Sequence, residues 1–328
     1  MAFLAWLKES FQASLLFASI FLVVLLRYFL KLKSEKRKSN LPPNPPKLPI
    51  IGNLHQLSNM PHQSLQCLAK KYGPIIYLQL GEIPTVVVSS ARLAKEVMKT
   101  HDLALSSRPK IFSAKHLFYD CSDVLFSPYG AYWKHIRKIC INELLSAKRV
   151  QLYSFIREEE VARLVHRVAE SYPSTTNLTK LLGIYANDVI CRVAYGRDFS
   201  AGGEYDRHGF QNMLEEFQIL LGGISIGDFF PSMEFIHNFT GMKSRLQNIF
   251  GRYDKLFDQL LAEHQNPKRD KVEHKDLIDV LLDIQKNDSD EIPLTTDNIK
   301  AIILVSVHFL FHFPHCYKLP TYKLLLNI

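Results

Sequence analysis

The sequence predicts a mainly α-helical fold with a small N-terminal β-sheet, preceded by one transmembrane helix. Three observations predict this class. They are an uncharged apolar run near the N-terminus, two short β-branched runs after a proline-rich segment, and helical periodicity through most of the remaining chain. With 328 residues, of which 47% are hydrophobic, the chain can bury a substantial core.

Residues 1–32 are expected to form an N-terminal membrane anchor. Phe11–Leu26 contains no charged side chain, and its extension to Leu30 gives a helix of roughly 30 Å, the thickness of the hydrocarbon layer. A cleaved signal peptide would have its basic residues before the apolar run. Here Arg27 and the basic residues of 31–38 follow it. The order favours an uncleaved single-pass signal anchor in contact with lipid, with the body facing the cytosol.

Residues 33–49 form a basic and proline-rich hinge. Five prolines lie between Leu41 and Pro49, and each fixes φ and removes an amide donor, so the segment is stiff and extended. It could be a polyproline ligand, but the apolar "IIGNL" that follows at once favours a spacer. Much of the net charge of +8 lies in this region, and no basic-aromatic interleaving elsewhere suggests nucleic acid.

The body, residues 50–304, opens with a helix over His62–Gly73 and a β-hairpin. "IIYLQLG" and "TVVVSS" are the expected strands, joined by "EIP". "SARLAKEVMKTH" returns to helical period, with Ser89 or Ser90 as the N-cap. Further helices are expected at Tyr132–Leu145, Tyr153–Ser171, Leu178–Tyr195, Asp206–Leu221, Gly241–Asn266 and Lys275–Lys286.

The five cysteines are scattered, odd in number and without a C-x-x-C pair, which favours reduced thiols that pack as small buried hydrophobes. His308, His312, His315 and Cys316 are metal-ligand types near the C-terminus. They lie in an apolar run without acidic residues, so we expect no metal site there.

The segment "SPYGAYWKHIRK" (Ser127–Lys138) places Trp133 and Arg137 four residues apart, on one face of a helix. An indole donor above a guanidinium suits a planar cofactor with pendant carboxylates. From spacing alone, an ordinary amphipathic helix with Trp133 in the core and Arg137 on the surface is the favoured interpretation.

The order of several motifs changes that balance. The proline hinge is followed by "YGPIIYLQLG", "SSRP", "DVLFSPYGAYWKHIRKI", "NDVICRVAYGRDF", "GDFFPSM", "HKDLIDVLLDIQ" and "LTTDNIKAIIL". In this order, through about residue 304, the chain resembles the cytochrome P-450 family of haem-thiolate monooxygenases, most closely the plant microsomal enzymes. The resemblance implies the N-terminal part of that fold and an endoplasmic reticulum membrane location.

The resemblance also implies roles for particular residues. Trp133 and Arg137 would contact the haem propionates. The segments Lys110–Val124 and Leu220–Pro231 would border the pocket of a small hydrophobic substrate. A basic strip, formed by Lys134, Lys138, Lys148 and Arg149, would face an acidic NADPH-dependent reductase. A merely solvated basic face is nearly as well supported by the sequence.

Parts of the family pattern are missing from these 328 residues. There is no Phe-x-x-Gly-x-Arg-x-Cys-x-Gly loop to supply the axial thiolate. The family's downstream Glu-x-x-Arg pair and its Ala/Gly-Gly-x-Asp/Glu-Thr oxygen-activation segment are also absent. Thr295, Thr296 and Asp297 are expected to cap the family's central helix, with Ile299, Ile302 and Ile303 on one face. Residues 305–328 are interpreted as a non-family tail in which Pro314 and Pro320 break any helix.

Two functional hypotheses follow. In the first, the chain derives from membrane-bound monooxygenases that oxidise specialised metabolites with O2 and reductase-supplied electrons. In the second, it is a non-catalytic, membrane-anchored fragment or a partner-binding protein. The missing thiolate loop favours an inactive, truncated chain with no catalytic residue of its own.

Overall fold

The structure is a computed structural model, and it describes residues 19, 22, 41–198, 207–223, 225–269, 274–287 and 292–315. The chain divides into two compact units, Met1–Lys95 and Glu96–Ile328. The expected anchor and most of the basic hinge lie outside the described residues. Within the described part, no helix combines the length and apolar character needed to cross a membrane.

The first unit contains one small antiparallel hairpin. Its elements are the 3₁₀ helix η1 (Leu54–Gln56), helix α2 (Pro61–Tyr72), strands β1 (Ile75–Leu80) and β2 (Ile83–Val88), and helix α3 (Ala91–Lys95). The hairpin was predicted, but its connector differs, because Ile83 and Pro84 belong to β2 and pair with Leu80 and Gln79. Gly81, at φ +59°, begins the turn instead. Pro84 is tolerated because both strands of a two-stranded sheet are edges.

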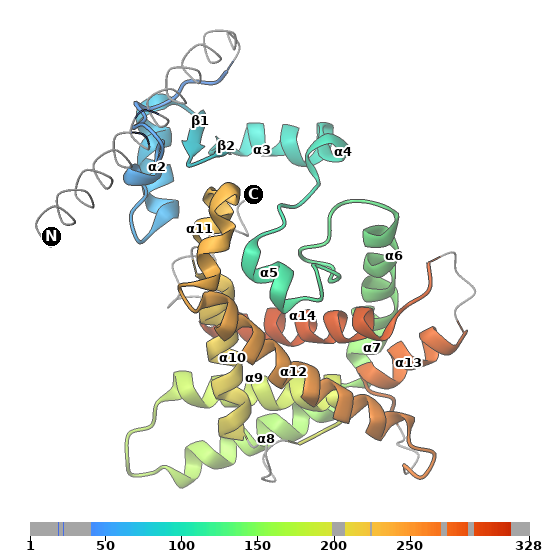
Figure 1. Cartoon of the computed structure of the whole chain (residues 1–328). Helices are drawn as coiled ribbons and strands as arrows, with labels where there is room; N and C mark the ends of the chain where they lie inside the picture. Colours follow the sequence, from blue (N-terminus) through green and yellow to red (C-terminus); the bar gives the residue numbers. More distant parts are fainter. Residues whose placement is uncertain are drawn as a thin grey trace, which may run out of the picture. The chain divides into compact units, whose positions relative to one another are not determined.

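Among its described residues the second unit consists of helices joined by loops and has no strand (Figure 1). Its elements are the π-helix η2 (Glu96–Thr100), α4 (Asp102–Leu105), α5 (Phe112–Leu117), α6 (Ala131–Ile139), the π-helix η3 (Cys140–Leu144), α7 (Ala147–Leu152), α8 (Ser154–Glu170), α9 (Leu178–Tyr195), α10 (Arg207–Gly222), α11 (Ile226–Phe229), the 3₁₀ helix η5 (Pro231–Asn238), α12 (Met242–Gln265), α13 (Leu277–Asn287) and α14 (Thr296–His315). The predicted mainly helical class with one small sheet is confirmed.

The core of the second unit lies between α5, α9, α10, α12 and α14. In Figure 1, α8 and α9 run side by side, and α14 packs against α9. The largest buried side chains are aromatic and meet edge to face, as Phe217 and Tyr253 do at 5.4 Å between ring centroids. Buried Glu160 on α8 accepts from Arg163 on the same helix and from Arg192 on α9, which ties these two helices together.

Helix α14 begins where the sequence predicts and ends later in the chain than predicted. The Thr295 hydroxyl accepts from the Asn298 amide at 3.2 Å, and the Asn298 side chain accepts from the Thr295 amide at 3.0 Å, which makes a reciprocal cap. Ile299, Ile302 and Ile303 are fully buried, as expected. The prediction that Pro314 breaks the helix is wrong, because α14 continues to His315. A proline in the last turn removes a single intrahelical hydrogen bond, which costs less than in a helix interior.

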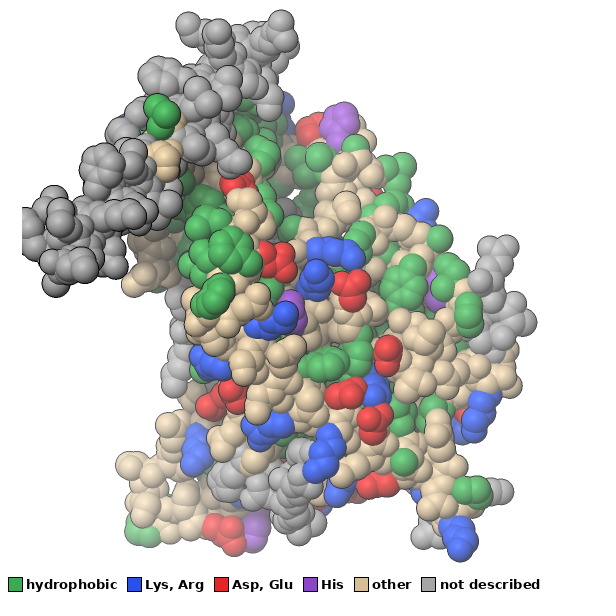
Figure 2. All heavy atoms as spheres, viewed as in Figure 1, with side chains coloured by type: hydrophobic (Ala, Val, Ile, Leu, Met, Phe, Trp, Pro, Cys, Tyr) green, Lys and Arg blue, Asp and Glu red, His purple; other side chains and the backbone are tan. Residues whose placement is uncertain are grey.

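The surface carries both signs of charge. Figure 2 shows Lys and Arg side chains interspersed with Asp and Glu on the face in view, with hydrophobic side chains between them. A mixed surface of this kind gives no single-sign field on that face.

Candidate cofactor and substrate site

Trp133 and Arg137 lie together on α6, as their spacing predicts. The guanidinium carbon of Arg137 is 5.1 Å from the centroid of the Trp133 ring, within the range of a cation–π contact. Trp133 is half-buried and Arg137 is exposed. Among the described residues no carboxylate pairs with Arg137. The indole face therefore orients a guanidinium that has no ion-pair partner in the described part of the chain.

The loop before α6 is fastened to that helix by two hydrogen bonds. The Trp133 indole donates to the Val124 carbonyl at 2.9 Å, and the Tyr132 hydroxyl donates to the Ser122 carbonyl at 2.6 Å. No sequence pattern indicated the first bond, since the indole was expected to serve a cofactor. In this structure the indole N–H donates its hydrogen bond to the loop instead.

Asp123 is a fully buried carboxyl at the centre of the same loop. Its Oδ1 accepts from the amides of Leu125 at 2.6 Å and Phe126 at 3.0 Å, while Oδ2 has no partner among the described residues. Burial raises the pKa of Asp123 to about 6, although the backbone hydrogen bonds oppose the rise. Sequence reasoning missed this residue, because an isolated aspartate before a turn reads as an ordinary cap.

The cysteine prediction is correct for three residues. Cys121, Cys140 and Cys191 are buried, but Cys67 is exposed, so the expectation of a buried thiol is wrong there. Only Pro61 of α2 is buried, so this helix buries little of its surface. Burial is the main cause that raises the pKa of Cys121 and of Cys140 to about 11. Both thiols are therefore protonated near neutrality.

The two segments expected to border a substrate pocket touch one another. The Phe112 amide at the start of α5 donates to Asp228 Oδ1 on α11 at 2.7 Å. The Phe112 ring stacks on buried His237 with centroids 4.3 Å apart. His237 Nε2 accepts from the Gly227 amide at 3.1 Å, which fixes η5 against α11. The structure thus brings residues of 110–124 and 220–231 into contact with each other.

A polar cluster that the sequence did not reveal joins the loop to α12 and α14. The Tyr119 hydroxyl donates to Asp254 Oδ1 at 2.7 Å, and buried Lys300 donates to Asp254 and Asp258 at 2.6 Å each. Burial opposes the charge of Lys300, but the bonds to both carboxylates outweigh it and raise the lysine pKa. Burial likewise opposes ionisation of Asp254, yet the bonds from Lys300 and Tyr119 lower its pKa.

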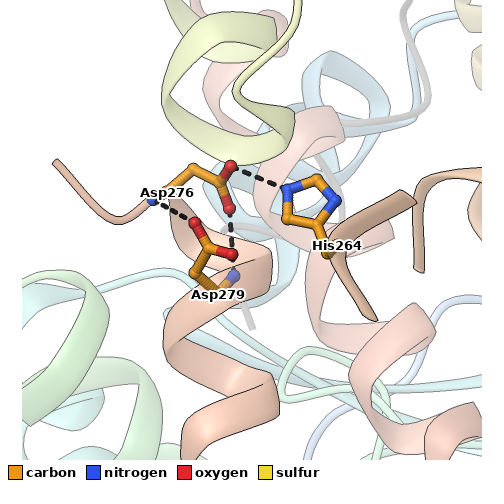
Figure 3. Close-up of side chains that lie close together, drawn as sticks. All are labelled: His264, Asp276 and Asp279. Atoms are coloured by element: carbon orange, nitrogen blue, oxygen red, sulfur yellow. Dashed lines mark hydrogen bonds and ion pairs between the residues drawn. The ribbon is translucent and has the colours of Figure 1, made fainter. Parts of the chain in front are cut away.

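A second polar cluster lies at the start of α13 (Figure 3) and comprises His264, Asp276 and Asp279. Asp276 and Asp279 exchange hydrogen bonds with each other's backbone amides, at 3.0 and 3.3 Å, and so cap the helix. His264 contacts Asp276 at 2.8 Å, and Arg269 pairs with both carboxylates at 3.1 and 2.8 Å. The ligand atoms lie within 4.8 Å of one another, but the Arg269 guanidinium already pairs with both carboxylates. These ion pairs, here called the latch, connect the end of α12 to the start of α13.

Comparisons with known proteins agree with this architecture. Residues 42–307 match the sequence model of the family described as Cytochrome P450. Cytochrome P450 71AP13 from Prunus mume is 75% identical over 93% of this chain and 59% of its own length. Strychnine-11-hydroxylase from Strychnos nux-vomica is 44% identical over 88% of this chain and 58% of its own length.

A solved zebra fish cytochrome P450 structure with abiraterone has a TM-score of 0.57 at 21% identity. The aligned part covers 76% of this chain and 54% of the zebra fish chain, and at this identity the likeness shows the fold alone. The curated relatives are longer than this chain, which spans about six-tenths of the length of those it matches (59% and 58%).

Proposed function

Because the chain belongs to the cytochrome P450 family, we propose that it carries the N-terminal part of a membrane-bound haem-thiolate monooxygenase of plant specialised metabolism. The match of residues 42–307 to the family, with 75% identity to one plant relative, carries this proposal. Such an enzyme inserts one oxygen atom of O2 into a small hydrophobic substrate and takes its electrons from an NADPH-dependent reductase. The family to which this chain belongs is that of the P450 monooxygenases, and it includes homologues in plant specialised metabolism.

Arg137 would hold a haem propionate. Its guanidinium is exposed, stacked on Trp133 and free of any described carboxylate, and Arg binds carboxylate in a fork. Trp133 fits in a different way from the one its donor suggests, because its N–H is bonded to Val124. We assign Trp133 the task of orienting Arg137. Haem, when bound, supplies the oxygen chemistry.

The segments 110–124 and 220–231 would form one wall of the substrate pocket. Their mutual contact through Phe112, Asp228 and His237 supports a shared surface, and its buried aromatic character suits an apolar ligand. The same packing would keep water away from a substrate bound at this wall.

The reductase would approach the basic strip. Lys134, Lys138 and Lys148 are exposed and Arg149 is half-buried, which supports an electrostatic encounter surface. An endoplasmic reticulum anchor in residues 1–32 would keep both proteins on one membrane. This location is proposed from the apolar run and the basic residues that follow it.

These 328 residues alone would not ligate haem iron through a thiolate, since they contain no cysteine in the family's loop. We therefore retain a non-catalytic, membrane-anchored, partner-binding role as a second candidate for the isolated chain.

A chimera tests the proposal. Residues 1–304 joined to the remaining C-terminal part of the 75% identical Prunus mume relative should take up haem and give a thiolate-shifted Soret band with carbon monoxide after reduction. In that chimera, Arg137→Ala should weaken haem retention on the order of tenfold, the scale of a charge-assisted hydrogen bond. Lys138→Ala, one residue along the same helix, should not. The chain alone should give no such band.

A thiolate-shifted band from the 328 residues by themselves would contradict the proposal that these residues alone do not ligate haem iron through a thiolate. A chimera that folds but retains no haem would contradict the family function assigned to this part of the chain.

A further inference from the structure

The backbone of the loop before α6 contains three consecutive left-handed residues. Tyr119, Asp120 and Cys121 have φ values of +48°, +56° and +61°, and none is glycine. Each such conformation is disfavoured for an L-residue with a side chain, and a run of three persists only where the surroundings hold it. The loop therefore needs an external restraint.

One restraint acts on the first residue of the run. The Tyr119 hydroxyl donates to Asp254 on α12 at 2.7 Å, and its ring packs edge-on against Phe250 of the same helix at 4.9 Å. The two bonded residues are 135 positions apart in sequence. Tyr119 is thereby held at both its polar and its apolar end.

Lys300 fixes the acceptor of that bond. Its side chain is 6% exposed, and its Nζ lies 2.6 Å from both Asp254 and Asp258. It also lies 5.9 Å from the centroid of the Tyr119 ring. If Asp254 turned away, the buried ammonium would keep only Asp258, whose side chain is 62% exposed, so the ion pair with Lys300 favours the observed orientation of Asp254. The Asp254 oxygen that serves Tyr119 is thus oriented by α14.

The other end of the loop is held by α6. The Ser122 and Val124 carbonyls accept from Tyr132 and Trp133 at 2.6 and 2.9 Å. The left-handed run therefore lies between two anchors, α12 and α14 on one side and α6 on the other.

We infer that Lys300 is the positioning residue for loop 119–124, acting through Asp254 and Tyr119 to hold the left-handed run and, through Val124, to set Trp133. Since this loop borders the proposed substrate pocket, Lys300 also determines which substrate shapes the wall admits; that last step rests on the proposed function. Tyr119 transmits the restraint, and we assign neither residue a catalytic role.

The test uses the full chain with Trp6→Phe, which leaves Trp133 as the sole tryptophan of the two. In this background, Tyr119→Phe removes one hydroxyl and keeps the ring. Hydrogen exchange should accelerate about tenfold at the Asp120 and Ser122 amides, which are bonded to the Lys115 and Phe118 carbonyls. Trp133 emission should move to longer wavelength, while exchange in α12 and α13 stays unchanged.

Asp254→Asn supplies a second variant, because it keeps an acceptor for Tyr119 but removes the charge that Lys300 orients. It should reproduce both the exchange and the emission changes in weaker form. Tyr172→Phe is the matched control, since Tyr172 is 85% exposed and its loss of a hydroxyl should change neither readout.

The inference is overturned if Tyr119→Phe leaves both the loop amides and Trp133 emission unchanged, or if exchange rises uniformly over the second unit. Neither measurement needs haem or turnover. Failure of the haem experiment therefore leaves this result standing, and the reverse also holds.

Discussion

His264 Nε2 lies 2.8 Å from Asp276 Oδ2, and the two side chains are only 2% and 5% exposed. The other ring nitrogen, Nδ1, lies 2.7 Å from the Leu260 carbonyl, so both nitrogens face acceptors. Only the protonated ring can donate to both. Burial opposes the charge, yet the bonds to Asp276 and Leu260 raise the pKa of His264 above its usual value.

This pair predicts a pH-dependent stability. A histidine whose folded pKa is raised contributes fully below about 6.5, its unfolded value, and the contribution is lost as pH rises through the folded pKa. His264→Gln should lower the free energy of unfolding by about 1–3 kcal/mol at pH 6 and by less at pH 9, measured by urea denaturation. His166→Gln, on an exposed surface pair, should change it by less than about 0.5 kcal/mol. A gap for His264→Gln that widens with pH would refute the assignment.

Gly196 should tolerate no side chain. It ends α9 at φ +61°, and a Cβ there would lie 2.4 Å from Asp276 Oδ2. Gly196→Ala should destabilise the fold by about 1–3 kcal/mol, from left-handed strain and displacement of the latch. Gly251→Ala in α12, where nothing lies within 4 Å, should instead be neutral or stabilising by up to about 1 kcal/mol. Equal effects in the two variants would exclude this explanation.

Asp123 should reduce stability as the pH rises through weakly acidic values. Its folded pKa of about 6 exceeds the usual 3.8, so the folded state binds the extra proton between these values. The free energy of unfolding should therefore fall by about 2–3 kcal/mol from pH 4 to pH 6.5 through this group. Asp123→Asn, which keeps Oδ1 for the Leu125 and Phe126 amides, should remove that component. Parallel profiles for the two proteins would count against it.

Lys300 should contribute to stability as well as to loop geometry. Lys300→Met should cost about 1–3 kcal/mol by urea denaturation, since it removes two charge-assisted hydrogen bonds from a buried position. Lys275→Met removes an exposed pair with Asp283 and should cost less than about 1 kcal/mol. If both variants lose the same amount, the buried pair has no special weight.

Local signals predicted the long helices well. Helix α9 begins and ends at the predicted residues because the Asn177 side chain caps it and Gly196 ends it. The expected helix over Tyr132–Leu145 is correct in extent but not in kind. Its last part, η3, is a π-helix with the Leu145 amide bonded to the Cys140 carbonyl, and that offset depends on packing rather than on residue type.

The candidate site was predictable only where its partners are neighbours in sequence. Trp133 and Arg137 meet because four residues separate them on one helix. The bond from Tyr119 to Asp254 crosses 135 residues, and that from Lys300 to Asp254 crosses 46. No periodicity encodes such contacts, since they form only once α12 and α14 pack beside the loop.

The bond from the Trp133 indole to the Val124 carbonyl has a further consequence. One hydrogen cannot satisfy two oxygens in good geometry at the same time. A ligand that accepted this hydrogen bond would have to break the one to Val124, so binding of such a ligand and this attachment of the loop would exclude each other.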